Sequence, residues 1–243
     1  MAKFRIDVLI ADKGLAESRE KAKALVMAGV VFVNGERAAK ADRLVDEQAT
    51  IEVRRNPLPY VGYGGLKLER AIREFGIGVK GKIAIDIGAS TGGFVDCLLQ
   101  AGASRVYAVD TGAGQLHEKL KKDPRVAPLE HVNARYLTPE DIGEKADIIT
   151  VDVSFISLKK IIPAALPLLA PGGSLVTLVK PQFEVGRYQV GKGGIVKDRQ
   201  RIDAVIDDIR QFGEQHGLRA LGVVEAPRDK ERKNREYFIL WER

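Results

Sequence analysis

From residue 65 onward, strand-like apolar runs alternate with helical patterns, and this alternation constrains the fold more than any other feature of the chain. The runs IAIDIG, VYAVD, IITVDV and LVTLVK are rich in Val and Ile almost without interruption. Such strands are typical of a parallel sheet that is covered by helices on both faces. The sequence therefore predicts an α/β domain with a Rossmann-like, doubly wound sheet, whose ligands bind at the carboxyl ends of its strands.

The first 59 residues differ in pattern and predict a separate, small α+β unit. Ser18 is a suitable N-cap for a helix over 19–28, and the β-branched run VVFV ends at an Asn34-Gly35 turn. Two prolines and three glycines then occur within residues 57–65, a composition typical of a connection between domains. We therefore expect a first domain over 1–59, a linker over 60–64 and a large domain over 65–243.

Composition excludes several classes of protein. With 45% hydrophobic and 30% charged residues, the chain can bury a core, so wholesale disorder is excluded. No uncharged run approaches the ~18–20 residues that cross a bilayer, and Asp7 and Asp12 stand where a signal peptide needs an apolar centre. One cysteine and three scattered histidines offer neither a disulfide nor a metal site. We expect a cytoplasmic protein that holds no metal.

The excess of positive charge is concentrated in one stretch. The net charge is +6, and residues 180–201 carry six basic and two acidic side chains, so four of the surplus charges lie there. A basic surface suits a polyanionic partner, although many basic proteins bind none. From charge alone, a binding surface and an ordinary solvated loop are equally good interpretations of this stretch.

A glycine-rich loop joins the first strand of the large domain to a helix. Glycines let the backbone approach a ligand closely, and the helix N-terminus offers free amides. Asp110 ends the next strand, 22 residues after Gly88, where a carboxylate can accept the hydroxyls of a ribose. The alternative, a tight turn beside a solvated aspartate, is less favoured because loop, helix and acidic residue fall in order. The predicted cofactor-binding residues are Asp86, Gly88, Ala89, Ser90, Thr91, Gly92, Gly93, Phe94 and Asp110.

The loop favours a particular nucleotide. Ser90 stands where a dinucleotide-binding loop needs its second glycine, and no Gly-Lys-Ser/Thr of a P-loop occurs. Asp86 would repel a pyrophosphate but suits a cationic group. A ligand with a ribose, a positive centre and no phosphate is S-adenosylmethionine, and the loop resembles the first motif of Rossmann-like methyltransferases. A methyl donor is therefore favoured over a dinucleotide.

Two charged residues emerge from apolar strands at the same end of the expected sheet. Asp152 follows IITV and Lys180 follows LVTLV. Either alone is equally well explained as a solvated strand end, but together they form a carboxylate–ammonium pair facing one cleft. Burial can lower the pKa of a lysine, which suits the amine to act as a base. A sugar hydroxyl needs such help as a nucleophile, whereas Cys97, in mid-helix among apolar residues, is expected to pack in the core.

Five stretches of the large domain, GGLKLERA, DIGASTGGF, VDVSFISL, LVKPQFE and NREYF, resemble those of the TlyA/hemolysin-A family. The N-terminal stretch SREKAKALVMAGVVFVNG resembles an S4 RNA-binding module. Together the matches follow the family's order over nearly the whole chain. The resemblance implies an S4-like domain followed by an FtsJ-like methyltransferase domain, which uses S-adenosylmethionine to methylate a ribose 2′-hydroxyl of ribosomal RNA, with a cytidine as the target.

FtsJ-like enzymes use a Lys–Asp–Lys–Glu tetrad, and the matching positions here are Lys67, Asp152, Lys180 and Glu236. By analogy, Lys180 activates the 2′-hydroxyl, Asp152 orients that lysine, and Lys67 and Glu236 position the target ribose. Without the resemblance, Lys67 is interpreted as a solvated helix residue and Glu236 as a strand-edge charge. One departure is that Gly62-Tyr63 stands where related sequences carry Ser-Arg, so an arginine suited to RNA phosphate is missing and substrate engagement is expected to differ.

The resemblance extends to further binding residues. In the S4-like module the candidates for contact with structured RNA are Arg5, Arg19, Lys21, Lys23 and Asn34. The alternative there is an amphipathic helix whose lysines are merely solvated. In the large domain, Asn133 is expected to meet the adenine edge of the cofactor, and the Gly-rich basic segment 186–197 is expected to form a flap over the RNA.

Three other functions remain as alternatives to an enzyme acting on ribosomal RNA or ribosomal subunits. A non-catalytic RNA-binding or ribosome-assembly factor would retain the fold, but intact Asp152 and Lys180 argue against it. The membrane-lytic activity implied by the hemolysin name ranks last, because no lytic or spanning segment is evident. A dinucleotide-dependent oxidoreductase is disfavoured by the loop. The sequence leaves the oligomeric state open.

Overall fold

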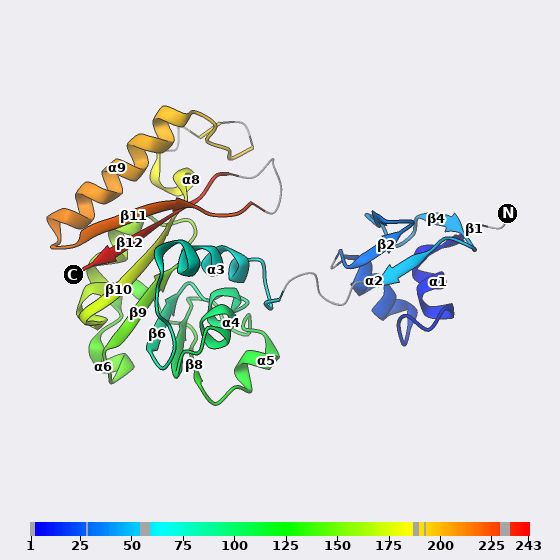
Figure 1. The fold of residues 1–243 in the computed structure, drawn as a ribbon, viewed down its shortest axis with the longest axis horizontal. Coiled ribbons are helices and arrows are strands. Elements are labelled where there is room, and N and C mark those ends of the chain that lie inside the picture. The colour runs from blue at the N-terminus through cyan, green and yellow to red at the C-terminus, as the bar shows by residue number, and fades with distance from the viewer. Residues whose placement is uncertain (1–2, 28, 54–58, 187–189, 192, 229–233) are drawn as a thin grey trace. The chain divides into compact units, whose positions relative to one another are not determined.

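The fold is given by a computed structural model, which describes residues 3–27, 29–53, 59–186, 190–191, 193–228 and 234–243. The chain divides into two compact units, Met1–Pro59 and Tyr60–Arg243 (Figure 1). Each unit has its own hydrophobic core. None of the helices described combines the length and the apolar character that crossing a membrane requires.

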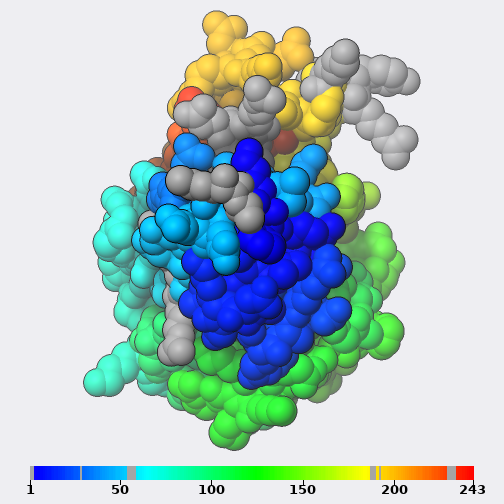
Figure 2. Space-filling view, turned by 90° about the vertical axis from the view of Figure 1, so that its right-hand side faces the viewer, coloured from blue at the N-terminus to red at the C-terminus, as the bar shows by residue number. Residues whose placement is uncertain are grey.

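The N-terminal unit combines two helices with two small antiparallel sheets. Its core consists of Ile6, Leu9 and Ile10 of the first helix, Ala22 and Val26 of the second, and the inward side chains of the strands. Figure 2 shows the surface of this unit, coloured blue to light blue. The elements are β1 (Lys3–Arg5), α1 (Ile6–Asp12), α2 (Arg19–Met27), β2 (Val31–Val33), β3 (Glu36–Arg37), β4 (Leu44–Asp46) and β5 (Ile51–Val53), with sheet orders β1-β4 and β3-β2-β5.

The helix N-cap and the turn that the sequence predicts for this unit are both present in the structure. The Ser18 hydroxyl accepts a hydrogen bond from Lys21 N at 3.2 Å, which is the bond of an N-cap. Asn34 and Gly35 both have positive φ, 50° and 82°, and join β2 to β3. The Asn34 side chain also accepts a hydrogen bond from Thr50 N at 2.9 Å, so it ties the turn to β5.

The large unit is built on a seven-stranded sheet of order β11-β12-β10-β9-β6-β7-β8. Its strands are β6 (Ile83–Ile87), β7 (Arg105–Val109), β8 (Val126–Leu129), β9 (Ala146–Val151), β10 (Leu169–Val179), β11 (Arg219–Glu225) and β12 (Tyr237–Glu242). The expected parallel sheet is in fact mixed, because β12 runs antiparallel to both β10 and β11. β11 and β12, which follow one another along the chain, pair directly as antiparallel neighbours.

Both faces of this sheet are buried, which explains why its strands are almost continuously apolar. Ile85 and Ile149 contribute to the core on one face, while Ala84 and Ile148 contribute to the core on the other. The helices are α3 (Gly64–Phe75), α4 (Gly93–Gln100), α5 (Glu118–Lys121), α6 (Pro139–Ile142), α7 (Ile162–Ala165), α8 (Pro181–Glu184) and α9 (Arg199–Gln215), with 3-10 turns at Ala134–Tyr136, Leu158–Lys160 and Leu166–Leu168. Residues of α3, α4 and α5 cover one face and residues of α6, α7 and α9 the other. This arrangement leaves the carboxyl ends of the parallel strands as the edge where a site can form.

Candidate active site

The loop after β6 is shaped by residues with positive φ. Gly88 has φ 91°, and a Cβ there would lie 2.5 Å from Asp152 O, so only glycine allows the ends of β6 and β9 to approach so closely. Gly92 has φ 95° and faces Leu120, whose Cδ1 would lie 2.2 Å from an added Cβ. Ser90, the residue that departs from the dinucleotide pattern, also has a positive φ of 47°. The loop is therefore held in one conformation by its neighbours.

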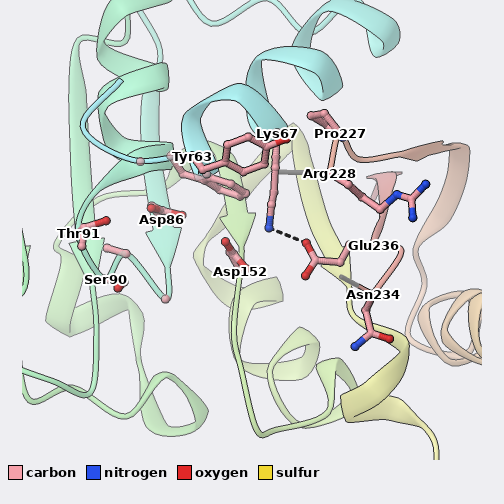
Figure 3. Close-up of a pocket in the computed structure, with 15 residues that line it drawn as sticks. Tyr63, Lys67, Asp86, Ser90, Thr91, Asp152, Pro227, Arg228, Asn234 and Glu236 are labelled. Carbon is pink, nitrogen blue, oxygen red and sulfur yellow. Dashed lines mark hydrogen bonds and ion pairs between the residues drawn. The ribbon is translucent and has the colours of Figure 1, made fainter. Parts of the chain in front are cut away.

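A hollow of about 260 Å³ lies against this loop (Figure 3). It is lined by Asp86, Gly88, Ala89, Ser90, Thr91, Gly93 and Phe94 from the loop region, by Tyr63, Gly64 and Lys67 from the start of α3, and by Asp152, Pro227, Arg228, Asn234 and Glu236. Most of the predicted cofactor residues and three of the four tetrad positions thus line one space.

Asp86 is the buried carboxyl group of this hollow. Its side chain is 1% exposed, and its Oδ1 accepts a hydrogen bond from the Thr150 hydroxyl at 2.7 Å. Its Oδ2 has no hydrogen-bond partner in the described structure. The pKa of Asp86 is raised to about 8, chiefly by burial; the charges of Asp152 and Asp110 add to this effect and the Thr150 bond opposes it. A buried carboxyl oxygen without a donor suits a cationic group of a ligand.

A second hollow, of about 410 Å³, shares Gly88, Ser90 and Asp152 with the first, so the two are neighbours. Asp110 and Asn133 both line it. The Asp110 carboxylate accepts hydrogen bonds from Ser90 N at 2.8 Å and Gly112 N at 2.7 Å, which fixes its orientation. Asn133 caps the turn that follows β8 by accepting from Arg135 N at 3.2 Å. A fixed carboxylate at this strand end is suited to the hydroxyls of a ribose.

Asp152 and Lys180 form the pair expected from their strand ends. Lys180 Nζ lies 2.5 Å from Asp152 Oδ1 and donates a hydrogen bond to the Ser154 hydroxyl at 3.0 Å. The lysine is 9% exposed. Asp152 lines both hollows, so Lys180 reaches them through this ion pair. The amine of Lys180 is therefore held in place by two oxygen atoms, one from Asp152 and one from Ser154.

Lys67 and Glu236 form a second ion pair, with Nζ 2.5 Å from Oε2 and side chains 18% and 17% exposed. Figure 3 shows Lys67 extending from α3 toward Glu236, with Asp152 facing the same space. Sequence reasoning without the family resemblance missed both residues, because neither follows an apolar parallel strand. The structure thus gathers all four tetrad positions into two neighbouring ion pairs.

Glycines set the position of α3 over the cofactor loop. A Cβ on Gly93 would lie 3.0 Å from Gly65 N, so α3 and α4 meet backbone to backbone. The segment 60–64, expected as a linker, lies within the second compact unit. Val61 N donates to the buried Asp96 Oδ2 at 2.9 Å, and Tyr63 lines the first hollow. Tyr63, expected in the linker, is thus part of the wall of the site.

Phe155 is a residue that sequence reasoning did not single out. It is 91% exposed with φ 63°, and its ring centroid lies 4.9 Å from that of Phe183. It borders the second hollow, three residues after Asp152. An exposed aromatic side chain in a strained conformation is unusual, and it marks a surface suited to stacking. The nearest sequence signal is the stretch VDVSFISL, which carries part of the family resemblance but in which only Asp152 is predicted to have a role.

In the N-terminal unit, the predicted RNA-binding residues are also used internally. Arg5 and Arg19 each lie 3.0 Å from the fully buried Asp7 carboxylate. Hydrogen bonds from Arg5 and then from Arg19 outweigh the opposing effect of burial and lower the pKa of Asp7 to about 2. Lys21 pairs with Glu17, while Lys23 is exposed. The two arginines keep enough exposure, 39% and 46%, to present part of their guanidinium groups to a ligand.

Two further expectations for the large unit concern the flap over 186–197 and the packing of Cys97. Within the expected flap 186–197, residues 187–189 and 192 lie outside the described residues. Of the rest, Val196 N donates to Asn234 Oδ1 and Asn234 Nδ2 donates to Gly194 O, both at 2.8 Å, so the segment is tied to a residue of the first hollow. Cys97 is buried in α4, and burial raises the pKa of its thiol to about 12.

The sheet order, the glycine-bearing loop after β6 and the acidic end of β7 together define a Rossmann-like methyltransferase fold. Residues 60–243 match the family described as FtsJ-like methyltransferase, and residues 4–51 match the S4 domain. The chain belongs to the FtsJ-like methyltransferase family, in the group whose members also carry an S4 domain.

Similar proteins are known from several bacteria. The chain is 49% identical to YqxC of Bacillus subtilis, and the match covers 93% of this chain and 80% of YqxC. It is 42% identical to the 16S/23S rRNA (cytidine-2′-O)-methyltransferase TlyA of Mycobacterium tuberculosis, over 98% of this chain and 88% of TlyA. A solved structure from Streptococcus thermophilus, called a hemolysin, is 43% identical with a TM-score of 0.77, and covers 100% of this chain and 89% of that chain.

Proposed function

We propose that this protein is an S-adenosylmethionine-dependent methyltransferase that methylates the 2′-hydroxyl of a cytidine ribose in ribosomal RNA. The observation that carries the proposal is the pair of neighbouring ion pairs, Lys180 with Asp152 and Lys67 with Glu236, beside the cofactor loop. Lys67, Asp152 and Glu236 line the first hollow, and Lys180 is paired to one of them. This arrangement suits a hydroxyl that must be positioned and deprotonated. The TlyA relative, whose name gives this reaction, supports the assignment.

The residues of the two hollows fit S-adenosylmethionine. The fixed Asp110 carboxylate would accept the ribose hydroxyls, and Asn133 lines the same hollow where an adenine edge would lie. The buried Asp86, with its unpartnered Oδ2, would face the ammonium of the amino-acid end in the first hollow. When bound, the cofactor supplies an electrophilic methyl group on a positively charged sulfur. Asp152 and Gly88, which border both hollows, would then lie nearest the transferable group.

The chain's own residues would prepare the nucleophile. Asp152 Oδ1 and the Ser154 hydroxyl hold Lys180 Nζ in a fixed direction. In its neutral form this amine accepts the proton of the 2′-hydroxyl as the oxygen attacks in line. Lys67 and Glu236 would hydrogen-bond the neighbouring ribose oxygens and keep the attacking oxygen in that line. The four side chains Lys67, Asp152, Lys180 and Glu236 are between 10% and 20% exposed, which limits competition from water.

The N-terminal unit would recognise the RNA. It matches the S4 domain and exposes Lys23 together with part of Arg5 and Arg19. Basic groups on a small rigid unit bind phosphates in a shape-dependent way. We propose ribosomal RNA, as naked RNA or within a ribosomal subunit, as the partner of this surface.

Transfer of a radiolabelled methyl group from S-adenosylmethionine to ribosomal subunits and ribosomal RNA that lack the modification tests the proposal. Digestion to nucleosides then locates the label. We expect it on a 2′-oxygen of cytidine with the wild-type protein and with Lys160→Ala, which changes an exposed lysine that lines neither of the two hollows. Label on a base contradicts the role given to the tetrad. No transfer, with the cofactor bound, would instead favour a non-catalytic RNA-binding factor.

A further inference from the structure

A third hollow, of about 350 Å³, adjoins the candidate active site and plays no part in the chemistry described so far. It is lined by Arg70, Glu225, Ala226, Pro227 and Arg228. Pro227 and Arg228 also line the first hollow, so the two spaces share a wall. Figure 3 shows Pro227 and Arg228 on the side of Lys67 and Glu236 that lies away from the cofactor loop. The third hollow therefore lies beyond the proposed ribose-binding pair.

Two links fix this hollow to the Lys67–Glu236 pair. Ala226 N donates a hydrogen bond to Glu236 O at 2.8 Å, which holds the end of β11 beside the residue that binds Lys67. On α3, Arg70 follows Lys67 by three residues, so the two side chains lie on adjoining parts of one helix face. Their Cα positions differ by ~4.5 Å along the helix axis. A chemical group bonded to the ribose that Lys67 contacts would thus lie close to Arg70.

Arg70, which lines this hollow, has an unused donor. Its Nε is buried and has no hydrogen-bond partner among the residues that the structure describes, and no ion pair joins Arg70 to any of them. The contrast is Arg73 on the same helix, which pairs with Glu74 at 3.2 Å. Glu225, the acidic residue of the hollow, is already engaged by Arg235 at 3.3 Å and by Arg228, whose Nε lies 4.0 Å from its Oε1, so the two arginines and one glutamate of the lining leave one positive charge in excess. The hollow consequently has a net positive charge and a buried donor without an acceptor, and leaving such a donor unpaired is costly.

We propose that this hollow binds a phosphodiester group of the substrate RNA, next to the ribose that is methylated. The inference rests on the proposed function and extends it to a binding site for the RNA backbone. A ribose held by Lys67 and Glu236 carries a phosphate on its 3′-oxygen and another on its 5′-oxygen, so one phosphate must lie close beside that pair. An arginine guanidinium presents donors in a planar fork that matches phosphate oxygens. The phosphate thereby fixes the direction in which the RNA strand crosses the site.

The test compares Arg70→Met with the matched control Arg73→Met, which removes an exposed arginine one turn further along α3. Methyl transfer to unmodified ribosomal subunits is measured at several salt concentrations, together with the cofactor affinity. We expect Arg70→Met to raise KM for the RNA about tenfold at low salt, with kcat and cofactor affinity within about twofold. The slope of log KM against log salt concentration should fall by ~0.9, the loss of one phosphate contact. Arg70→Lys should recover part of the affinity.

Other outcomes would overturn the inference. If Arg70→Met behaves like Arg73→Met, or raises KM with an unchanged salt slope, no phosphate is bound by Arg70. A loss of kcat and cofactor affinity together, with a lower melting temperature that Arg70→Lys restores while KM stays at the wild-type value, would assign Arg70 to packing alone. If the wild-type protein transfers no methyl group, the proposed function itself fails. The same salt series on direct RNA binding then still decides whether Arg70 contacts a phosphate.

Discussion

Lys67 Nζ lies 2.5 Å from Glu236 Oε2, although 169 residues separate the two along the chain. The lysine comes from the first turn of α3, and the glutamate directly precedes β12, which runs antiparallel to both of its neighbours. Their contact closes the side of the first hollow opposite the cofactor loop. The antiparallel strand is therefore what completes the site, since a parallel strand at this place would begin at the other edge of the sheet.

Removing the amine of Lys180 should stop the reaction without emptying the cofactor site. Lys180→Ala deletes the group that Asp152 and Ser154 hold in place, so we expect transfer to fall by at least about 100-fold. Cofactor affinity should stay within a few-fold, because the lysine acts on the acceptor. Single-turnover transfer and calorimetry of cofactor binding measure the two quantities. Wild-type turnover in this variant contradicts the mechanism.

The carboxylate of Asp110 should contribute directly to cofactor affinity. Asp110→Ala removes the acceptor for the ribose hydroxyls and also the acceptor of the Ser90 and Gly112 amides. We expect the binding free energy of S-adenosylmethionine to weaken by ~1–3 kcal/mol, because buried donors are left unpaired. Calorimetric titration measures it, with Asp123→Ala as a control at an acidic residue that pairs with Arg125 instead. An unchanged affinity would remove Asp110 from the cofactor site.

Cofactor binding should release a proton from Asp86. Burial raises the pKa of this carboxyl to about 8, so at neutral pH the free protein holds it mainly protonated. A cationic group beside Oδ2 favours the ionised form, so cofactor affinity should rise as the pH rises toward about 8. Calorimetry in buffers of different ionisation enthalpy measures the protons released. In Asp86→Asn, which keeps the shape of the side chain, the release should vanish and the affinity should fall. Equal proton release in both proteins would contradict this role.

Asp7 should make the N-terminal unit sensitive to acid. Its folded-state pKa of about 2 lies below the ordinary value of 3.8, so its contribution to stability is present above ~4 and is lost as the pH falls through about 2. The shift corresponds to about 2 kcal/mol. Asp7→Asn should lower the unfolding free energy of this unit by at least that amount at neutral pH, because Arg5 and Arg19 lose their common partner. Chemical denaturation followed by circular dichroism at several pH values checks this, and an Asp7→Asn protein as stable as the wild type would refute it.

Much of the cofactor side could be predicted because it depends on strand order alone. Asp110, Asp152 and Lys180 each follow an apolar strand, and parallel strands end at one edge of a sheet. Lys67 and Glu236 could not be found in this way. Their meeting depends on the packing of α3 against α4 through Gly65 and Gly93, and on the reversed direction of β12. Neither of these is a local property of the sequence.

The sequence also could not show which polar side chains are buried or paired inside the protein. In the N-terminal unit, β1 and β4 are three residues each and too short to show a period, so their pairing was not expected. Arg5 and Arg19 have the spacing of a basic surface, but the buried Asp7 that draws them together is itself a charged residue in a helix. A single sequence gives no sign that such an aspartate faces inward. Arg70 is the corresponding case in the large unit, because its unused donor is evident only from its surroundings.

Phe155 should contribute to RNA binding rather than to cofactor binding. Its ring stays 91% exposed although it borders the second hollow, and Phe183 supports one side of it, so the free face is available to a base of the RNA. Stacking of a base on an aromatic ring contributes ~1–3 kcal/mol. Phe155→Ala should therefore raise KM for ribosomal RNA by the factor that corresponds to this stacking free energy, and it should leave cofactor affinity within about twofold. Phe155→Trp should keep the wild-type KM. Tyr136→Ala is the matched control, because Tyr136 is 71% exposed and lines neither of the two hollows. A variant that weakens the cofactor and leaves KM for RNA unchanged would place the ring against the adenine instead, since the same hollow holds Asp110 and Asn133.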